Sequence, residues 1–337
     1  MKIPEKGSGV RLLLVVLLFL ALLFGAFVLS ICVGTKNITF PVLLDSFFSY
    51  DPTNSSHIII QTLRVPRAVV AAAVGSSLAV SGSLMQASTR NPMASPSVLG
   101  INAGAGLGLA LAMIFVPAAT FNETVFFSFL GAAAATILIF GIASACRAGS
   151  SPVRLALVGT AITSLFNAFS QALAMFFNIS QELTFWNAGG VSGVRPEQAR
   201  MLLPWTGLGL LIALLMARSV SLLSLGEEVA VGLGGKTRYI KFMASLAVLI
   251  LTGSSVAIAG PISFVGLVVP HGVKAVVGAD YQKVIPCSIL AGALLVVLAD
   301  ILSRMVNPPF ETPTGAITAL VGVPFFVYLA RRKGSRV

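Results

Sequence analysis

The residue types that most often carry chemistry are sparse in this sequence. It has two histidines, His57 and His271, and three cysteines, Cys32, Cys146 and Cys287, which lie far apart inside apolar runs. Because no CxxC pair occurs, neither a zinc site nor a disulfide framework is expected. The sequence also offers no nucleophile paired with a general base. We therefore predict no metal site, no catalytic residue and no enzyme activity.

A glycine-rich run at residues 230–237 comes nearest to a nucleotide-binding motif. It reads AVGLGGKT, but Ala230 stands where a phosphate-binding loop requires its first glycine, and no strand pattern precedes it. We interpret the run as a glycine-rich helix end followed by cytoplasmic cations. The chain is therefore expected to carry no ATPase of its own and to bind no cofactor.

Asp300 is the one acid well inside an apolar run, and an acid within a membrane is a functional candidate. Arg304 follows four positions later, so a structural ion pair on one helix face is an equal alternative. Transporters driven by protons or sodium usually need more than one such group, which counts against ion coupling. His271, after Pro270, is interpreted as a hydrogen-bonded structural residue rather than a ligand.

The segment at residues 219–236 predicts a short helix too short to cross a membrane. Ser224 and Glu227 have the spacing of a capping box, and Glu227 and Glu228 would lie in the first turn, where the helix dipole favours anions. Gly234 and Gly235 provide a left-handed stop. We expect two to three turns in the cytoplasm. They would either order a loop or dock a cytoplasmic partner.

The composition of the chain indicates the environment in which these elements lie. Hydrophobic residues make up 56% of the 337 positions, charged residues only 10%, and the mean hydropathy is +0.96. A soluble domain has about 25% charged residues, so a water-soluble enzyme is excluded. The net charge of +11 would indicate a nucleic-acid surface in a soluble chain. In a chain this apolar, it first indicates membrane topology.

Ten apolar runs are long enough to suggest membrane-spanning helices. The first is too long for the core of a signal peptide and is interpreted as a retained helix. In the third, Gly100, Gly104 and Gly108 recur every four residues and predict close helix packing. The runs cover approximately residues 11–33, 66–86, 98–117, 124–146, 154–178, 201–217, 241–260, 262–277, 285–303 and 314–330.

The distribution of cations predicts the orientation of these runs. With the N-terminus inside and ten alternating spans, 16 of the 22 Lys and Arg residues fall on the inside and 6 on the outside. The positive-inside rule then places both termini in the cytoplasm. The fold expected is a single all-α polytopic membrane domain over residues 1–337, with about ten transmembrane helices.

Four sequence blocks resemble the permease subunits of the type II ABC importers for iron chelates, haem and vitamin B12. Their order and spacing match over nearly the whole chain. The blocks are RVPR at residues 64–67 with 72–86, RNPMASP at 90–96 with 99–101, LGEEVA at 225–230 with 233–234, and AGPISFVGL at 259–267 with 269–271, 298–300 and 313–326.

The resemblance implies a dimer of permeases, identical or paralogous, with two cytoplasmic ATPases that bind ATP and magnesium and one extracytoplasmic binding protein. The arginines Arg64, Arg67 and Arg304 would meet glutamates of the binding protein, since guanidinium groups pair bidentately with carboxylates. For Arg64 and Arg67, anchoring at the lipid headgroups is the alternative. Contact with the ATPase would fall on Leu225, Gly226, Glu227, Glu228, Val229 and Leu233, with both glutamates either meeting basic groups or serving only the cap.

The resemblance also implies a cytoplasmic gate at two loops, marked by Asn91 and Met93 and by Ser151 and Pro152. Pro152 stands where some relatives have a hydroxyl residue, which puts that half of the gate in question. A proline is also well suited to the first turn of a helix, which is the structural alternative.

The function implied is ATP-driven import of a ferric siderophore by alternating access, in the cytoplasmic membrane of a bacterium. Siderophores are favoured over haem and cobalamin only because they are the commonest substrates of the family. An ion-coupled secondary transporter and a structural or receptor-like membrane protein are the alternatives from other classes.

Overall fold

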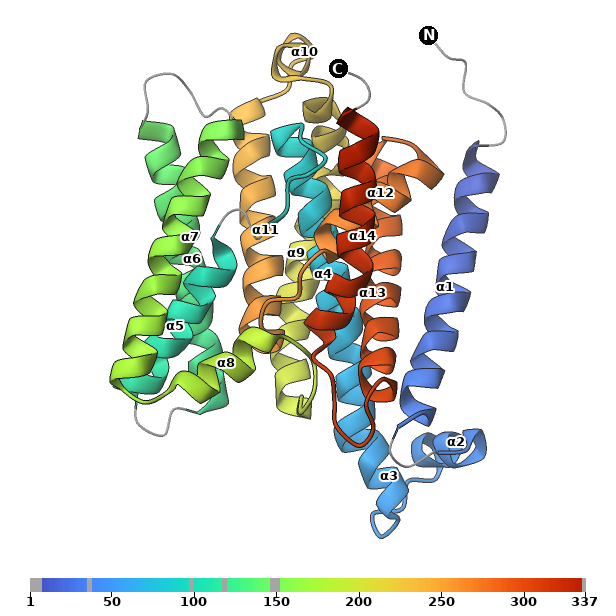
Figure 1. Ribbon diagram of the computed structural model, residues 1–337. Coiled ribbons are helices and arrows are strands. Elements are labelled where there is room, and N and C mark those ends of the chain that lie inside the picture. Colours follow the sequence, from blue (N-terminus) through green and yellow to red (C-terminus); the bar gives the residue numbers. More distant parts are fainter. Residues whose placement is uncertain (1–7, 35–37, 97–99, 117–119, 146–151, 335–337) are drawn as a thin grey trace.

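The computed structural model describes residues 8–34, 38–96, 100–116, 120–145 and 152–334, and all regular structure in these ranges is helical. Figure 1 shows the helices packed side by side as a bundle, with most long helices running between the same two ends. The start of α1, the end of α14 and the short helix α10 lie together at one end. We call this end the inner end, following the charge distribution of the sequence, and the opposite end the outer end.

Each of the ten predicted apolar runs corresponds to one long helix in the described part of the chain. Seven helical segments are long and apolar enough to cross a membrane, whereas α5, α12 and α14 contain shorter apolar stretches. The helices are α1 (Ser8–Cys32), α4 (Val65–Thr89), α5 (Ile101–Phe115), α6 (Phe121–Ala145), α7 (Pro152–Phe176), α9 (Pro196–Ser224), α11 (Thr237–Ala259), α12 (Val265–Val277), α13 (Tyr281–Met305) and α14 (Thr314–Gly334).

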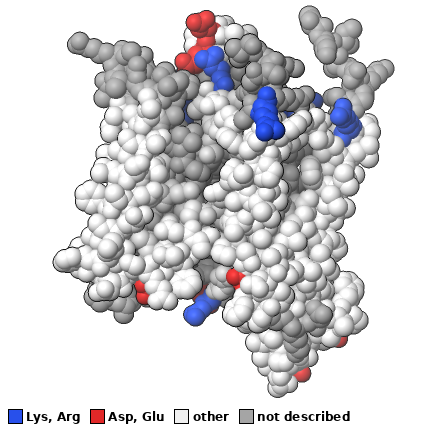
Figure 2. Space-filling model, viewed as in Figure 1, with Lys and Arg blue, Asp and Glu red and all other residues white. Residues whose placement is uncertain are grey.

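Short helices cover the two ends of the bundle. At the outer end, α2 (Phe40–Phe48), α3 (Ser55–Ile59) and a π-helical turn η1 (Ile60–Arg64) lead into α4, and α8 (Ser180–Ala188) precedes α9. At the inner end, α10 (Glu227–Gly232) connects α9 to α11. Figure 2 shows the charged residues drawn in colour at the two ends, with an uncharged band between them, as a bilayer requires.

Helix α4 forms the centre of the bundle and packs against α9, α11, α12 and α13. Its backbone comes very close to that of α13 at Gly75 and Gly292, and to that of α12 at Gly82 and Gly266. Small residues permit such approach where lipid supplies no hydrophobic driving force between helices. Helices α5 and α6 pack in the same way through Gly104, Gly108 and Gly131, which confirms the close packing predicted for Gly104 and Gly108. Gly100 lies before α5 and faces side chains rather than backbone.

A non-helical stretch separates α11 from α12 within the depth of the bundle. Helix α12 has 13 residues, about 20 Å at 1.5 Å per residue, which is less than the roughly 30 Å of a hydrocarbon core. Its N-cap, Phe264, has a left-handed backbone (φ 67°). The neighbouring backbone groups pair between segments: Gly190 N–H donates to Ala259 O at 2.7 Å, and Gly315 N–H donates to Gly189 O at 3.2 Å.

We predict that Gly82→Ala will strongly destabilise the fold, because the new Cβ would overlap the carbonyl oxygen of Gly266. Overpacking of this kind costs about 1–3 kcal/mol. Gly207→Ala on α9 is the matched control, since its Cβ would meet no atom within 4 Å. Thermal unfolding in detergent should show a lower midpoint for the first variant and little change for the second. Equal midpoints would contradict the close packing of α4 on α12.

Candidate functional site

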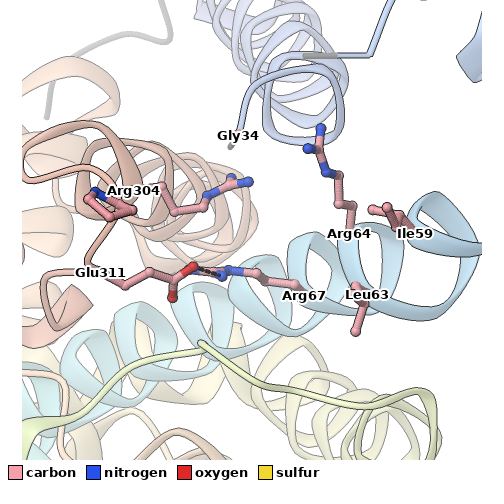
Figure 3. Close-up of a pocket in the computed structure, with 8 residues that line it drawn as sticks. Gly34, Ile59, Leu63, Arg64, Arg67, Arg304 and Glu311 are labelled. Carbon is pink, nitrogen blue, oxygen red and sulfur yellow. Dashed lines mark hydrogen bonds and ion pairs between the residues drawn. The ribbon is translucent and has the colours of Figure 1, made fainter. Parts of the chain in front are cut away.

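The three arginines expected at the outer face lie together in the structure. Arg64 ends η1, Arg67 lies in the first turn of α4, and Arg304 lies in the last turn of α13. They meet because α4 begins, and α13 ends, at the outer end of the bundle (Figure 1). With Gly34, Ile59, Leu63, Pro309 and Glu311 they line a cavity of about 230 Å³, shown in Figure 3.

Asp300 holds two of these arginines through its fully buried carboxylate. Arg67 Nε lies 3.0 Å from Oδ1 and 3.1 Å from Oδ2, and its Nη2 lies 2.9 Å from Oδ1. Arg304 Nη2 lies 3.1 Å from Oδ2, which confirms the expected ion pair four residues apart. Both arginine side chains are almost buried, so each charge depends on its partner. Asp300 therefore acts as the centre of an ionic cluster.

Arg64 and Arg304 also tie the bundle to the end of α1. Arg64 Nη1 donates to two carbonyls of α1, and Arg304 Nη1 donates at 3.0 Å each to one carbonyl of α1 and to that of the residue directly after it. The last carbonyls of a helix lack partners within it, and cations near them are stabilising. The accepting carbonyls belong to Ile31 and Cys32 for Arg64 and to Ser30 and Val33 for Arg304. Arg304 Nη2 donates in addition to Ser30 Oγ at 2.9 Å.

Glu311 completes the cluster from the loop between α13 and α14. Its Oε1 accepts from Arg67 Nη1 at 2.8 Å, and its side chain is 41% exposed, in contrast to the buried Asp300. The cluster thus contains three guanidinium groups and two carboxylates. The site can hold carboxylates on arginine donors, and one of its two carboxylates is accessible to solvent. Glu311 was not predicted from the sequence, because no spacing rule links it to Arg67.

The inner end carries the second candidate site, the segment around α10. The predicted capping box is wrong: Ser224 is the last residue of α9, and its hydroxyl donates to Ser221 O at 2.7 Å. The N-cap is instead Gly226, at φ 124°, a conformation that requires glycine. The helix has six residues, fewer than expected, and the left-handed stop at Gly234 (φ 79°) is confirmed.

Four apolar side chains are exposed on and beside this short helix, including Val231 at 59%. Leu225, Val229 and Leu233 are 64%, 48% and 63% exposed. Glu228 is exposed, and Glu227 forms an ion pair with Lys241 of α11, so this glutamate is held by its own chain. Adjacent exposed apolar residues with a polar rim are typical of a protein contact. We call Leu225, Val229 and Leu233 the inner apolar patch.

The expected gate residues lie at two places in the chain. Asn91 follows α4 in an exposed turn, where its Oδ1 accepts from the backbone N–H of Met93 at 2.9 Å. Pro152 is the first residue of α7, as predicted for a proline in the first turn of a helix. Ser151 lies outside the described residues.

The histidines have contacts that fit structural roles. His271 packs edge-on against Phe325, with ring centroids 5.5 Å apart. His57 Nδ1 accepts from the backbone N–H of Asp51 at 3.1 Å. In the same loop, hydrogen bonds from the hydroxyl and backbone N–H of Thr53 lower the pKa of the Asp51 carboxyl. Among the described residues, no three His, Cys, Asp or Glu side chains are grouped to hold a metal ion.

A helical bundle with these apolar spans and two charged ends defines a multi-pass membrane protein. The chain belongs to the FecCD transport family, whose model matches residues 19–332. It is 47% identical to the iron(3+)-hydroxamate import system permease protein FhuB of Bacillus subtilis, over 93% of this chain and 81% of the relative. It is 37% identical to the Fe(3+) dicitrate transport system permease protein FecC of Escherichia coli, over 82% and 84% of the two chains.

The fold is similar to that of a solved metal-chelate type ABC transporter in an inward-facing conformation. The TM-score is 0.83 at 28% sequence identity, and the match covers 94% of this chain and 98% of the other. The ten-helix architecture expected from the apolar runs is thereby confirmed.

We predict that Asp300→Asn will destabilise the protein far more than Glu311→Gln. The first change leaves two nearly buried guanidinium groups without a carboxylate between them, which costs about 3–5 kcal/mol. The second removes an ion pair with one exposed partner, worth about 0–1 kcal/mol. Unfolding midpoints of the two variants in the same detergent check this order. Similar midpoints would show that Asp300 does not hold the outer cluster together.

Proposed function

We propose that this chain is the permease subunit of an ATP-driven importer that carries a ferric siderophore into the cytoplasm of a bacterium. The observation that carries the proposal is the match of nearly the whole chain to permeases named for iron(3+)-hydroxamate and Fe(3+)-citrate import. Haem or cobalamin is a less favoured substrate, because these matching relatives are named for iron(3+) chelates.

In this proposal the outer cluster of Arg64, Arg67 and Arg304 receives carboxylates of an extracytoplasmic binding protein. Charged pairs at the rim of an interface steer docking more than they add affinity. Arg64 is buried, and the side chains of Arg67 and Arg304 are only 12% and 9% exposed, so the accessible donors are those that face the cavity beside Glu311. The partner should therefore present a protruding carboxylate rather than a flat acidic surface.

At the inner end, the coupling segment from Leu225 to Leu233 would rest on one of two ATPase subunits, which bind ATP and magnesium. The inner apolar patch supports this assignment, because it is exposed and is presented by a short helix with a defined start and stop. ATP binding and hydrolysis would move this segment. The loops of Asn91 and Met93 and of Ser151 and Pro152 would then part as the gate, in a dimer with a second permease subunit, identical or paralogous.

An ion-coupled mechanism has less support from the geometry. Asp300, the buried acid on which it would depend, is held by two guanidinium groups at 2.9–3.1 Å. Both oxygens of this carboxylate thus already take part in ion pairs with arginines of the same chain, as expected of a structural acid.

Reconstitution tests the proposed function directly. Proteoliposomes that contain the permease, its ATPase and its binding protein should accumulate radioactive iron supplied as a ferric hydroxamate only when ATP is enclosed with the ATPase. An ATPase without hydrolytic activity is the control. Uptake that persists without ATP and collapses when the ion gradient is dissipated would contradict the proposal.

We also predict that Leu225→Asp and Val229→Asp will reduce copurification of the ATPase by at least roughly fivefold, as loss of an interface anchor does. A charge placed on the inner apolar patch should weaken an apolar contact without disturbing the bundle, because both side chains are exposed. Phe48→Asp, an exposed apolar position on α2 at the outer end, is the matched control. Unchanged copurification in the first two variants would refute the role of the patch.

A further inference from the structure

Arg67 bridges two carboxylates that differ sharply in burial. Its Nε and Nη2 engage Asp300, which is fully buried, and its Nη1 engages Glu311, which is 41% exposed. Figure 3 shows Glu311 and Arg67, both of which line the cavity, pointing toward each other. One carboxylate is therefore a permanent part of the bundle, and the other lies where a carboxylate from outside would have to bind.

Arg64 and Arg304 donate hydrogen bonds to groups of their own chain. Arg304 uses Nη1 and Nη2 on α1 and on Asp300, and its Nε on the backbone oxygen of Asp300. Arg64 directs Nη1 at the carbonyls of α1, and Figure 3 shows its side chain turned away from Glu311. Nη1 of Arg67 is thus the donor that already holds a solvent-accessible carboxylate.

Release of Glu311 is far easier than release of Asp300. An ion pair with an exposed partner contributes little, because water replaces the lost contact, whereas a buried carboxylate has no such substitute. Exchange of Glu311 for another carboxylate keeps the number of ion pairs at Arg67 the same. The exchange also keeps the charge balance around the buried Asp300, which matters in a site of low dielectric.

We infer that Glu311 is the internal occupant of the binding site for the partner's carboxylate, and that docking proceeds by exchange of Glu311 for that carboxylate on Nη1 of Arg67. This inference rests on the proposed docking of an extracytoplasmic binding protein. The exchange frees the side chain of Glu311, which lies three residues before Thr314, the first residue of α14. The next residue, Thr312, stays attached through its N–H to Ser303 O at 2.9 Å.

Glu311→Gln tests the exchange, because it removes the competing charge at nearly constant shape. Docking of the cognate binding protein to the permease in lipid nanodiscs should tighten about two- to fivefold, the value of an exposed ion pair converted to a ratio of dissociation constants. Glu197→Gln controls for the general loss of negative charge. Glu197 is also an exposed glutamate, in the first turn of α9 at the outer end. It should change the affinity less than Glu311→Gln does.

A second permease variant, Arg67→Lys, distinguishes exchange of carboxylates from a long-range effect of charge. Arg67→Lys keeps the positive charge but cannot bridge two carboxylates with a planar fork. In this background the gain from Glu311→Gln should fall to the level of the Glu197→Gln control. A full gain there would overturn the inference, because it would show that charge alone is responsible.

The remaining outcomes are also decisive. If the wild type docks and Glu311→Gln docks with equal or lower affinity, the exchange is overturned and the proposed function stands. Docking by Glu311→Gln alone would support the exchange in its strongest form. If neither the wild-type permease nor Glu311→Gln binds the cognate binding protein, the proposed function and the exchange both fail.

Discussion

The outer half of the structure depends on one buried carboxylate placed between two guanidinium groups. Asp300 lies on α13, Arg67 on α4 and Arg304 again on α13, from which it reaches the end of α1. In a medium of low dielectric each of these charges is unfavourable without the others. The three helices must therefore assemble together at this end, and the glycine contacts of α4 extend the same arrangement toward the inner end.

The two candidate sites differ in chemistry. The outer cluster consists of charged groups whose partners lie mostly within the chain, whereas the inner apolar patch consists of exposed apolar side chains. A contact based on ion pairs depends on salt and can be reversed, and a contact based on apolar burial is less sensitive to salt. Helix α4 joins the two, because Arg67 lies in its first turn and its other end lies beside the turn of Asn91.

Much of this architecture could be predicted from local pattern. The ten apolar runs, the Asp300–Arg304 pair and the small-residue face of α5 depend on neighbours in sequence, and the structure confirms them. The pairing of Arg67 with Asp300 joins positions 233 residues apart, which no spacing rule can supply. The prediction of a cap at Ser224 was wrong because α9 continues past the expected end of its apolar run, at residue 217, as far as Ser224. Roles that depend on other subunits are not encoded in local pattern at all.

The non-helical stretch before α12 has a consequence for how the bundle can deform. A bilayer core offers no water to a peptide group that loses its partner, and each such group costs several kcal/mol. Here the partners come from separate segments: the turn after α8, the end of α11 and the start of α14. A shift of one of these segments alone would break a hydrogen bond that the bilayer cannot replace. The turn after α8, the end of α11 and the start of α14 are therefore expected to move together.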